Sequence, residues 1–272
     1  MMQQASCAIV SYCHGADEIA TLLASLCSCT PRPLLYLVDN SPTPALALVA
    51  ARHHAVYHHQ PHNPGFASAH NWAMRAALEH GSAYHFVINP DIHVQPDVLP
   101  CMLAYMEQHR DVGLLAPRVL YPDGRLQPLC KLLPEPVELA VRRFFPWLHG
   151  RGGARARYEM HVSGYDRVMD VPVLSGCFLL LRCDTLRQVG LFDERFFLYF
   201  EDVDLSRRIG RVARTVYVPD VHVEHEYARG SYRNARLLWH HVVSAVRYFN
   251  KWGWLDDPER ARVNEDAVRA LG

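Results

Sequence analysis

The sequence predicts an α/β fold built around a parallel sheet, and three observations support this prediction. In the first ninety residues, short apolar runs alternate with segments of helical periodicity, as in the βαβ units of parallel sheets. Polar residues stand at the carboxyl ends of these runs, where open parallel sheets bind ligands. The chain has 272 residues, and half of them are hydrophobic by type. It is therefore long enough to bury one large core.

The N-terminal half shows the alternation most clearly. Its strand-like runs are short and rich in Val, Leu, Ile and Tyr, whereas its helical segments repeat apolar residues every three or four positions. We predict strands at 7–12, 34–38, 55–58 and 84–88, separated by helices at 18–26, 45–52 and 67–80. A helix at about 96–109 and a strand at 112–116 follow.

The second half is less regular. An extended piece at 118–121 ends at a Pro-Asp-Gly turn. Residues 134–168 are rich in arginine and glycine, and we predict a mobile, basic loop region there, although a solvated linker has the same composition. Its arginines are Arg142, Arg143, Arg151, Arg155, Arg157 and Arg167. Order resumes at 171–182, and short extended pieces are expected at 216–219 and 221–226.

The most informative stretch, residues 196–208, places three acids directly behind an aromatic run. Four aromatic rings in five positions predict an extended, buried segment, and the apolar spacing after them predicts a helix. The acids Glu201, Asp202 and Asp204 then fall in its first turn. Helix capping and the helix dipole favour acids there in any protein. The stretch alone therefore does not separate a cap from a catalytic carboxylate.

The segment 237–252 predicts an amphipathic helix, with apolar residues on one face and arginines on others. We expect this helix to pack on the domain, and contact with a membrane surface is the alternative.

The bulk properties exclude several classes of protein. Lys plus Arg equals Asp plus Glu at 28 each, so no overall field attracts nucleic acid or an anionic membrane, and any basic partner site must be local. The eight cysteines are scattered without a CxxC pair, which indicates reduced thiols in the cytoplasm. The N-terminus lacks the pattern of a signal peptide, and the apolar run at 171–181 is too short to span a bilayer. We expect a cytoplasmic protein.

Three polar motifs at expected strand ends suggest a ligand site. Asp91, in Asn-Pro-Asp, offers a carboxylate oxygen of the kind that Mg²⁺ or Mn²⁺ binds. Asp39 is placed to accept a hydrogen bond from a ribose hydroxyl or a base. Asn63-Pro64-Gly65-Phe66 precedes a helix whose N-terminus could face an anion. Each motif has an ordinary alternative, a turn or a helix cap.

Taken together and in order, these motifs resemble those of the family 2 glycosyltransferases, which are inverting enzymes of the GT-A fold, and within that family the pattern is most similar to bacterial rhamnosyltransferases. The resemblance covers roughly residues 7–250. It is carried by Val10-Ser11-Tyr12, Val38-Asp39-Asn40-Ser41, Asn63-Pro64-Gly65-Phe66 with Asn71, Asn89-Pro90-Asp91, Ser175-Gly176 with Leu179-Leu180-Leu181-Arg182, Gly190-Leu191-Phe192-Asp193-Glu194, Phe200-Glu201-Asp202-Val203-Asp204-Leu205, and His225.

The resemblance implies a Rossmann-like, nucleotide-sugar-binding GT-A fold with a mixed central sheet and a C-terminal helical region. It implies a single domain over 1–230, with a nucleotide-binding half at 1–115 and an acceptor and catalytic half at 116–230. Residues 231–272 would form a helical extension.

Specific roles are implied by the same resemblance. Asp202 would be the catalytic base, and Asp91 with His225 would hold Mg²⁺ or Mn²⁺. The substrate contacts would come from Tyr12, Asp39, Asn40, Asn63, Gly65, Phe66, Asn71, Gly176 and Glu201.

In an inverting transfer, an acceptor hydroxyl attacks the anomeric carbon of the sugar while the nucleoside diphosphate leaves from the opposite face. A carboxylate takes the hydroxyl proton, and positive charge stabilises the leaving group. The resemblance implies transfer of rhamnose from dTDP-rhamnose to a glycan or lipid-linked glycan in bacterial cell-surface polysaccharide synthesis, with peripheral contact at the cytoplasmic membrane face. Two alternatives remain open. One is a UDP-linked galactofuranose, N-acetylglucosamine or glucose donor, and the other is a non-catalytic nucleotide-sugar-binding subunit. The sequence leaves the oligomeric state open.

Overall fold

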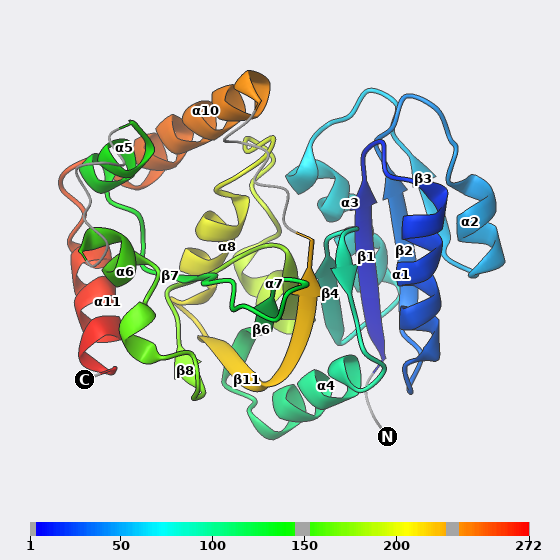
Figure 1. Ribbon diagram of the computed structural model, residues 1–272, viewed down its shortest axis with the longest axis horizontal. Helices are drawn as coiled ribbons and strands as arrows, with labels where there is room; N and C mark the ends of the chain where they lie inside the picture. The colour runs from blue at the N-terminus through cyan, green and yellow to red at the C-terminus, as the bar shows by residue number, and fades with distance from the viewer. Residues whose placement is uncertain (1–3, 145–152, 227–233, 272) are drawn as a thin grey trace.

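A mixed β-sheet forms the centre of the computed structural model, which describes residues 4–144, 153–226 and 234–271 (Figure 1). The strands follow the order β3-β2-β1-β4-β10-β6-β11-β5, and β8 pairs with β11. Their bounds are β1 Ala5–Ser11, β2 Leu34–Asp39, β3 Val56–His59, β4 Tyr84–Ile88, β5 Ile92–His93, β6 Val112–Leu120, β8 Met169–Asp170, β10 Phe178–Arg182 and β11 Arg214–His225. A separate pair joins β7 (Cys130–Lys131) to β9 (Val173–Leu174).

Strands β1 to β4 pair in parallel and are connected by helices, which confirms the predicted alternation. Side chains of β1 alternate between two apolar clusters. Cys7 and Ile9 pack with α1 (Ala16–Ser28), whereas Ala8 packs with α3 (Phe66–Glu79). The short helix α2 (Ala47–Arg52) precedes β3, and α4 (Val98–Gln108) precedes β6. The parallel order brings the carboxyl ends of β1, β2 and β4 to one edge of the sheet.

The sheet becomes mixed at β10, which is antiparallel to both β4 and β6. The helix α7 (Cys183–Val189) follows β10 directly. A mixed sheet is the arrangement that the family resemblance implies, and the first ninety residues alone predict only its parallel half.

Two strands are longer than the sequence predicts. The pieces expected at 216–219 and 221–226 are one strand, β11, and those at 112–116 and 118–121 are one strand, β6. Their pairing shifts register between Val218 and His222. Pro219 lies within this shift, and proline donates no ladder hydrogen bond, so it is tolerated at an irregularity. The two expected pieces are separated at Pro117 in β6 and at Asp220 in β11, yet the pairing of the two strands continues on both sides of each break.

The prediction of a loop over 134–168 is wrong where the structure describes this region. It contains α5 (Pro136–Phe144), α6 (Ala154–Tyr158) and a 3-10 turn at His161–Ser163, whereas residues 145–152 lie outside the described part of the chain. Tyr165 is buried and its hydroxyl donates to the Glu159 carbonyl at 2.7 Å. Buried aromatic anchors of this kind outweigh the basic composition.

The aromatic run before the acids is also not extended. Tyr199 and Phe200 both have left-handed backbone conformations, with φ of 69° and 68°. Phe196 and Phe200 are buried in a cluster with Tyr248, so packing of both rings on one side selects this turn. The helix predicted after it is confirmed as α8 (Glu201–Ile209).

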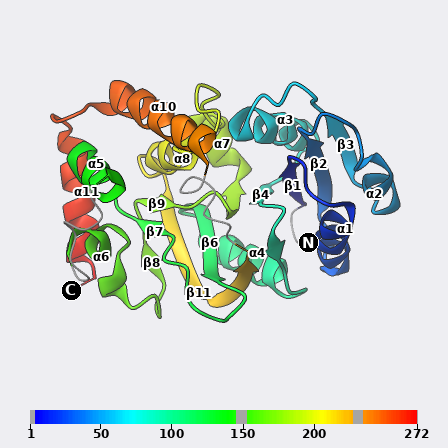
Figure 2. The same ribbon diagram turned by 45° about the horizontal axis from the view of Figure 1, so that its top comes forward.

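Two C-terminal helices pack on α8. The helix α10 (Ala235–Trp252) lies across it, and α11 (Pro258–Arg269) follows (Figure 2). Buried Asp204 accepts hydrogen bonds from Trp252 and Arg208, and its carboxylate also pairs with Lys251 at 2.6 Å. Within the described ranges, none of the helices is both long and apolar enough to cross a membrane. All eight cysteines are unbonded thiols.

Candidate active site

The ends of β1 and β2 build a first group of predicted residues. The Asn40 backbone nitrogen donates to the Ser11 carbonyl at 2.8 Å. Asp39 is fully buried and accepts hydrogen bonds from the Ser41 backbone at 3.0 Å and from the Tyr57 hydroxyl at 2.8 Å. Burial first, and then the bond to Asp39, raises the pKa of Tyr57. Tyr57 is a supporting residue that the sequence motifs did not indicate.

Beside this group lies an exposed aromatic side chain. Tyr12 is 46% exposed directly after β1, and the adjacent Cys13 donates from its backbone to the Ser41 hydroxyl at 2.8 Å. Its ring is therefore available to a planar ligand at this edge of the sheet.

The Asn63–Phe66 loop joins the first group to the aromatic run. The Asn63 side-chain oxygen accepts from Asn40 at 3.3 Å and from the Gly65 backbone at 3.2 Å. The Phe66 backbone donates to the Phe197 carbonyl at 2.8 Å. Gly65 has φ of +97°, and a Cβ there would lie 2.3 Å from that same carbonyl. Only glycine fits this contact between the two halves of the chain.

Asn71 is placed differently from the residues around it. It is buried on α3, and its amide exchanges hydrogen bonds with the Phe192 backbone at 2.8 and 3.0 Å. Its nitrogen also donates to Glu194 at 3.0 Å. These contacts hold the loop before the aromatic run in place, so Asn71 supports the site and does not line it.

The second group is centred on Asp202, at the start of α8. One carboxylate oxygen accepts from the Gly176 backbone at 3.0 Å, and the other accepts from the Val203 backbone at 2.8 Å. A Cβ at Gly176 would lie 3.4 Å from the Asp202 Cβ, so the turn and the acid are in close contact. The carboxylate is held in one orientation by two backbone donors.

Glu201 points the other way, into the protein. It is 5% exposed, and its Oε2 atom has no hydrogen-bond partner. Burial, and secondarily the charge of Asp202, raises the pKa of Glu201 well above its ordinary value. The two adjacent acids therefore have different environments.

Asp91 and His225 meet as the resemblance implies. The Asp91 Oδ1 atom lies 3.3 Å from the His225 Nε2 atom. The His225 Nδ1 atom faces the Gln127 side-chain oxygen at 3.0 Å. The Gln127 nitrogen donates to the carbonyls of His225 at 2.7 Å and Leu120 at 3.2 Å, which fixes its amide. Nδ1 is therefore the donor in the contact with Gln127, and Nε2 is the ring atom that faces Asp91.

This donor set suits a divalent ion. A carboxylate oxygen and an imidazole nitrogen are ligands of Mn²⁺, and a carboxylate suits Mg²⁺. Gln127 orients the histidine as outer-shell partners do in metal sites. Among the described residues, no three His, Cys, Asp or Glu side chains gather to hold a metal. Diphosphate oxygens would therefore have to complete the coordination.

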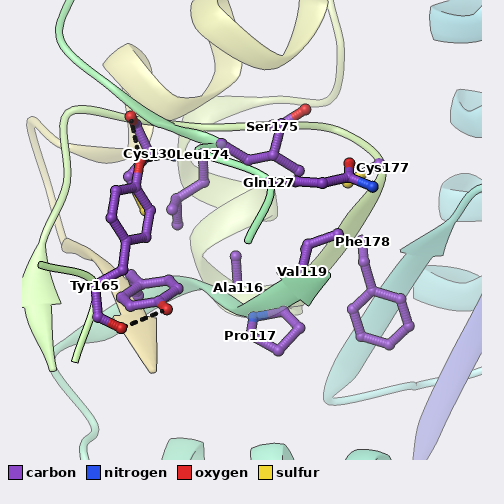
Figure 3. Close-up of a pocket in the computed structure, with 12 residues that line it drawn as sticks. Ala116, Pro117, Val119, Gln127, Cys130, Tyr165, Leu174, Ser175, Cys177 and Phe178 are labelled. Atoms are coloured by element: carbon purple, nitrogen blue, oxygen red, sulfur yellow. Dashed lines mark hydrogen bonds between the residues drawn. The ribbon is translucent and has the colours of Figure 1, made fainter. Parts of the chain in front are cut away.

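The turn at 175–177 lies between Asp202 and the Asp91–His225 pair. The Asn89 backbone donates to the Cys177 carbonyl at 2.8 Å, and Gly176 holds Asp202. Burial raises the pKa of Cys177 to about 12, and the charges of Asp91 and Asp202 act in the same direction. Behind the turn, Gln127, Ser175 and Cys177 line part of a small pocket of about 10 Å³ (Figure 3). Asp91 and Asp202 thus stand around a single turn.

The sequence profile of glycosyl transferase family 2 matches residues 6–160 of this chain. The N-acetylglucosaminyl-diphospho-decaprenol L-rhamnosyltransferase of Mycobacterium tuberculosis is 29% identical over 273 residues, covering 92% of this chain and 86% of that protein. The rhamnosyltransferase WbbL of Escherichia coli K12 is 26% identical over 257 residues, covering 88% and 90%.

Solved structures share the fold at lower identity. GalNAc-T7, crystallised with UDP, GalNAc and Mn²⁺, superposes with a TM-score of 0.64 at 14% identity. The match covers 92% of this chain and 48% of that longer one. The mannosyltransferase PcManGT of Pyrobaculum calidifontis, with GDP-Man and Mn²⁺, has a TM-score of 0.61 at 17% identity, and the match covers 99% of this chain and 75% of that one.

Proposed function

Since this chain belongs to glycosyl transferase family 2 and has the GT-A fold, we propose that it transfers rhamnose, with inversion, from dTDP-rhamnose to a lipid-linked glycan in bacterial cell-surface polysaccharide synthesis. The enzyme class, a nucleotide-sugar-dependent glycosyltransferase, follows from the family. The donor sugar and the acceptor rest on two rhamnosyltransferase relatives, one of which is named for a decaprenol-linked substrate. Work on a membrane-held acceptor would place the protein at the cytoplasmic face.

The observation that carries the mechanism is the fixed carboxylate of Asp202 beside the Asp91–His225 pair. Asp202 would accept the proton of the attacking acceptor hydroxyl as the new glycosidic bond forms. The bond from the anomeric carbon to the diphosphate breaks at the opposite face of the sugar. A divalent ion, Mg²⁺ or Mn²⁺, when bound by Asp91 and His225, would supply positive charge to the leaving diphosphate.

The other predicted residues divide into two kinds of role. Tyr12, Asn40 and Asn63 surround the nucleotide side of the site, and Gly65 and Phe66 set its contact with the catalytic half. Asp39 would reach the nucleoside only if its bonds to Tyr57 and Ser41 rearrange, because it is fully buried. We assign positioning roles to Gly176, Asn71 and Glu201.

Replacing Asp202 with Asn tests the proposal. The variant should bind dTDP as tightly as the wild type in a calorimetric titration with Mn²⁺, because Asp202 is not on the nucleotide side. Transfer from dTDP-rhamnose should fall by about 10²–10⁴-fold, the usual contribution of a general base. The exposed Asp184→Asn on α7 is the matched control and should keep full activity.

Undiminished transfer by Asp202→Asn would reject the base assignment. Turnover of a UDP-sugar in preference to dTDP-rhamnose would reject the donor, and competition between UDP and dTDP in the same titration separates these nucleobases. A wild-type protein that binds nucleotide yet transfers no sugar from any donor would indicate the non-catalytic subunit.

A further inference from the structure

We propose that the outward face of α10 binds the surface of an anionic lipid bilayer. The inference rests on the proposed function and deepens it, because it names the part of the protein that would hold the active site against a lipid-linked acceptor.

The helix α10 has two apolar faces. The inner face packs in the protein, where Ala245, Tyr248 and Phe249 are at most 9% exposed. The outer face repeats apolar residues every three or four positions, which places them in one stripe along the helix. This stripe consists of Ala235, Trp239, Val242 and Val246. A soluble helix usually has a polar outer face, so the second stripe needs its own explanation.

The stripe exposes large side chains to solvent. Trp239 is 65% exposed and Val246 is 39% exposed. Trp254 and Leu255, just beyond the end of the helix, are 44% and 81% exposed. These four are a large share of the exposed bulky apolar residues in the described part of the chain, and they lie within seventeen consecutive positions. Large apolar side chains exposed this close together in the chain favour association with another surface.

The charge on α10 is of one sign, although the whole chain is neutral. The helix contains Arg236, Arg247 and Lys251 and no acidic residue. Lys251 is neutralised by Asp193 and Asp204, so Arg236 and Arg247 provide the attraction. Both arginines are exposed beside the apolar stripe. Tryptophan and apolar side chains flanked by arginines are typical of helices that lie in the interface of anionic membranes.

The helix is connected directly to the catalytic stretch. The ring of His240 stacks on Phe197 at 4.3 Å, and the Ser244 hydroxyl donates to the Leu198 carbonyl at 2.9 Å. In Figure 1, α10 lies toward the top of the molecule, as do the carboxyl ends of β1 and β2. A bilayer against α10 would therefore lie on the same side of the protein as the active site.

A second copy of the chain fits the face less well than a bilayer. A two-fold contact through α10 would bring the same patch of both copies together. Arg236 and Arg247 would then face like charges, with no acid on the helix to oppose them.

The experiment is flotation of the purified protein with vesicles in the absence of donor sugar. The protein should float with vesicles of phosphatidylglycerol and phosphatidylcholine in equal parts, and not with phosphatidylcholine alone. Trp239→Ala should weaken binding at least about tenfold, by removing a large apolar side chain. Arg236→Gln should weaken it about fivefold, and added salt should weaken the wild type. Leu48→Ala, at a 73% exposed site on α2, is the matched control and should bind as the wild type does.

Equal flotation of the wild type and Trp239→Ala would overturn the inference. So would a dimer that forms without lipid and is abolished by Trp239→Ala in analytical ultracentrifugation. The proposed function has a separate readout, since rhamnose transfer to a water-soluble acceptor should be unaffected by Trp239→Ala. Vesicle binding without any sugar transfer would support the membrane surface and reject the proposed function.

Discussion

Asp202 and Glu201 show how neighbouring residues of one chemical type diverge in a fold. Two consecutive positions at the start of α8 point in different directions, because helical residues one apart are separated by about 100°. Asp202 receives two backbone hydrogen bonds, whereas Glu201 is buried with one oxygen unpaired. The sequence shows the pair, but burial decides their roles.

The raised pKa of Glu201 has a defined consequence for stability. Burial raises it above the unfolded value, so the folded state retains a proton that the unfolded state releases as the pH increases. The stability of the wild type relative to Glu201→Gln should therefore be greatest below about pH 4 and should decline as the pH rises above the ordinary Glu pKa of about 4.3. We expect Glu201→Gln to be the more stable protein at pH 7, by at least about 1 kcal/mol. Urea unfolding of both proteins from pH 4 to 8 measures this difference.

Glu194→Gln provides a control of opposite sign. Hydrogen bonding from Asn71, with help from Arg75, lowers the pKa of Glu194, so its stabilising effect is lost as the pH falls. This variant should be less stable than the wild type at pH 7, and the two should converge in acid. A pH-independent difference for Glu201→Gln would contradict the assignment of a buried, protonated acid.

At the scale of elements, α8 is held by the two C-terminal helices through a buried cluster of charges. The guanidinium of Arg207, with its side chain only 3% exposed, binds both oxygens of Asp257 at 2.6 and 2.7 Å. It also pairs with Glu259 at 2.7 Å and lies 4.2 Å from the Trp252 ring. The sequence predicts the helix and its acids. It does not indicate that Arg207 is buried, or that its partner is Asp257, 50 positions later in the chain.

Replacing Arg207 with Met should be strongly destabilising. The change leaves Asp257 as a buried charge without its main partner, and such losses cost about 3–5 kcal/mol. Arg211→Met is the matched control, because Arg211 binds the same Glu259 from a site that is 50% exposed, and it should cost under about 1 kcal/mol. Chemical denaturation measures the free energy of unfolding of both variants. Equal losses would contradict a larger contribution from the buried Arg207 than from the exposed Arg211.

Prediction at this scale succeeded where local pattern and tertiary packing agree. The βαβ alternation up to β4 and the helix after Phe200 are confirmed. The prediction of a loop over 134–168 failed because distant contacts, such as Tyr165 against Cys130, determine that segment. The prediction of an extended aromatic run also failed, because Phe196 and Phe200, at its two ends, both pack in the apolar cluster that includes residues of α10.

For the molecule as a whole, the sequence motifs predict which residues gather at the site, yet not what holds the two halves together. Asp91 and His225 are 134 positions apart and lie 3.3 Å apart in space. Gly65 and Phe197 are 132 positions apart, and no local sequence pattern around either residue predicts their contact. The order of the motifs predicts a site from these residues, and the geometry shows how the Gly65 loop is joined to the aromatic run before α8.

Gly65→Ala tests this junction. The added Cβ would lie 2.3 Å from the Phe197 carbonyl, so the loop and the aromatic run must separate. We expect a loss of stability greater than the roughly 1 kcal/mol of an ordinary glycine-to-alanine change at positive φ, together with weaker dTDP binding and slower transfer. Gly81→Ala is the matched control, because Gly81 has φ of +75° but open space around its Cβ position. Thermal unfolding and nucleotide titration measure both, and equal effects would contradict a junction at Gly65.

The pairing of β11 with β5 has a consequence for how this protein tolerates change in length. His225 stands opposite Ile92, and the Glu226 backbone donates to the Asp91 carbonyl at 3.0 Å, so strand register itself sets the spacing between Asp91 and His225. Because successive side chains of a strand face opposite ways, inserting or deleting one residue between Pro219 and His225 would turn the imidazole to the wrong face. Neighbouring side chains could repack around many single substitutions along β11. They could not restore the position of His225 after the insertion or deletion of one residue.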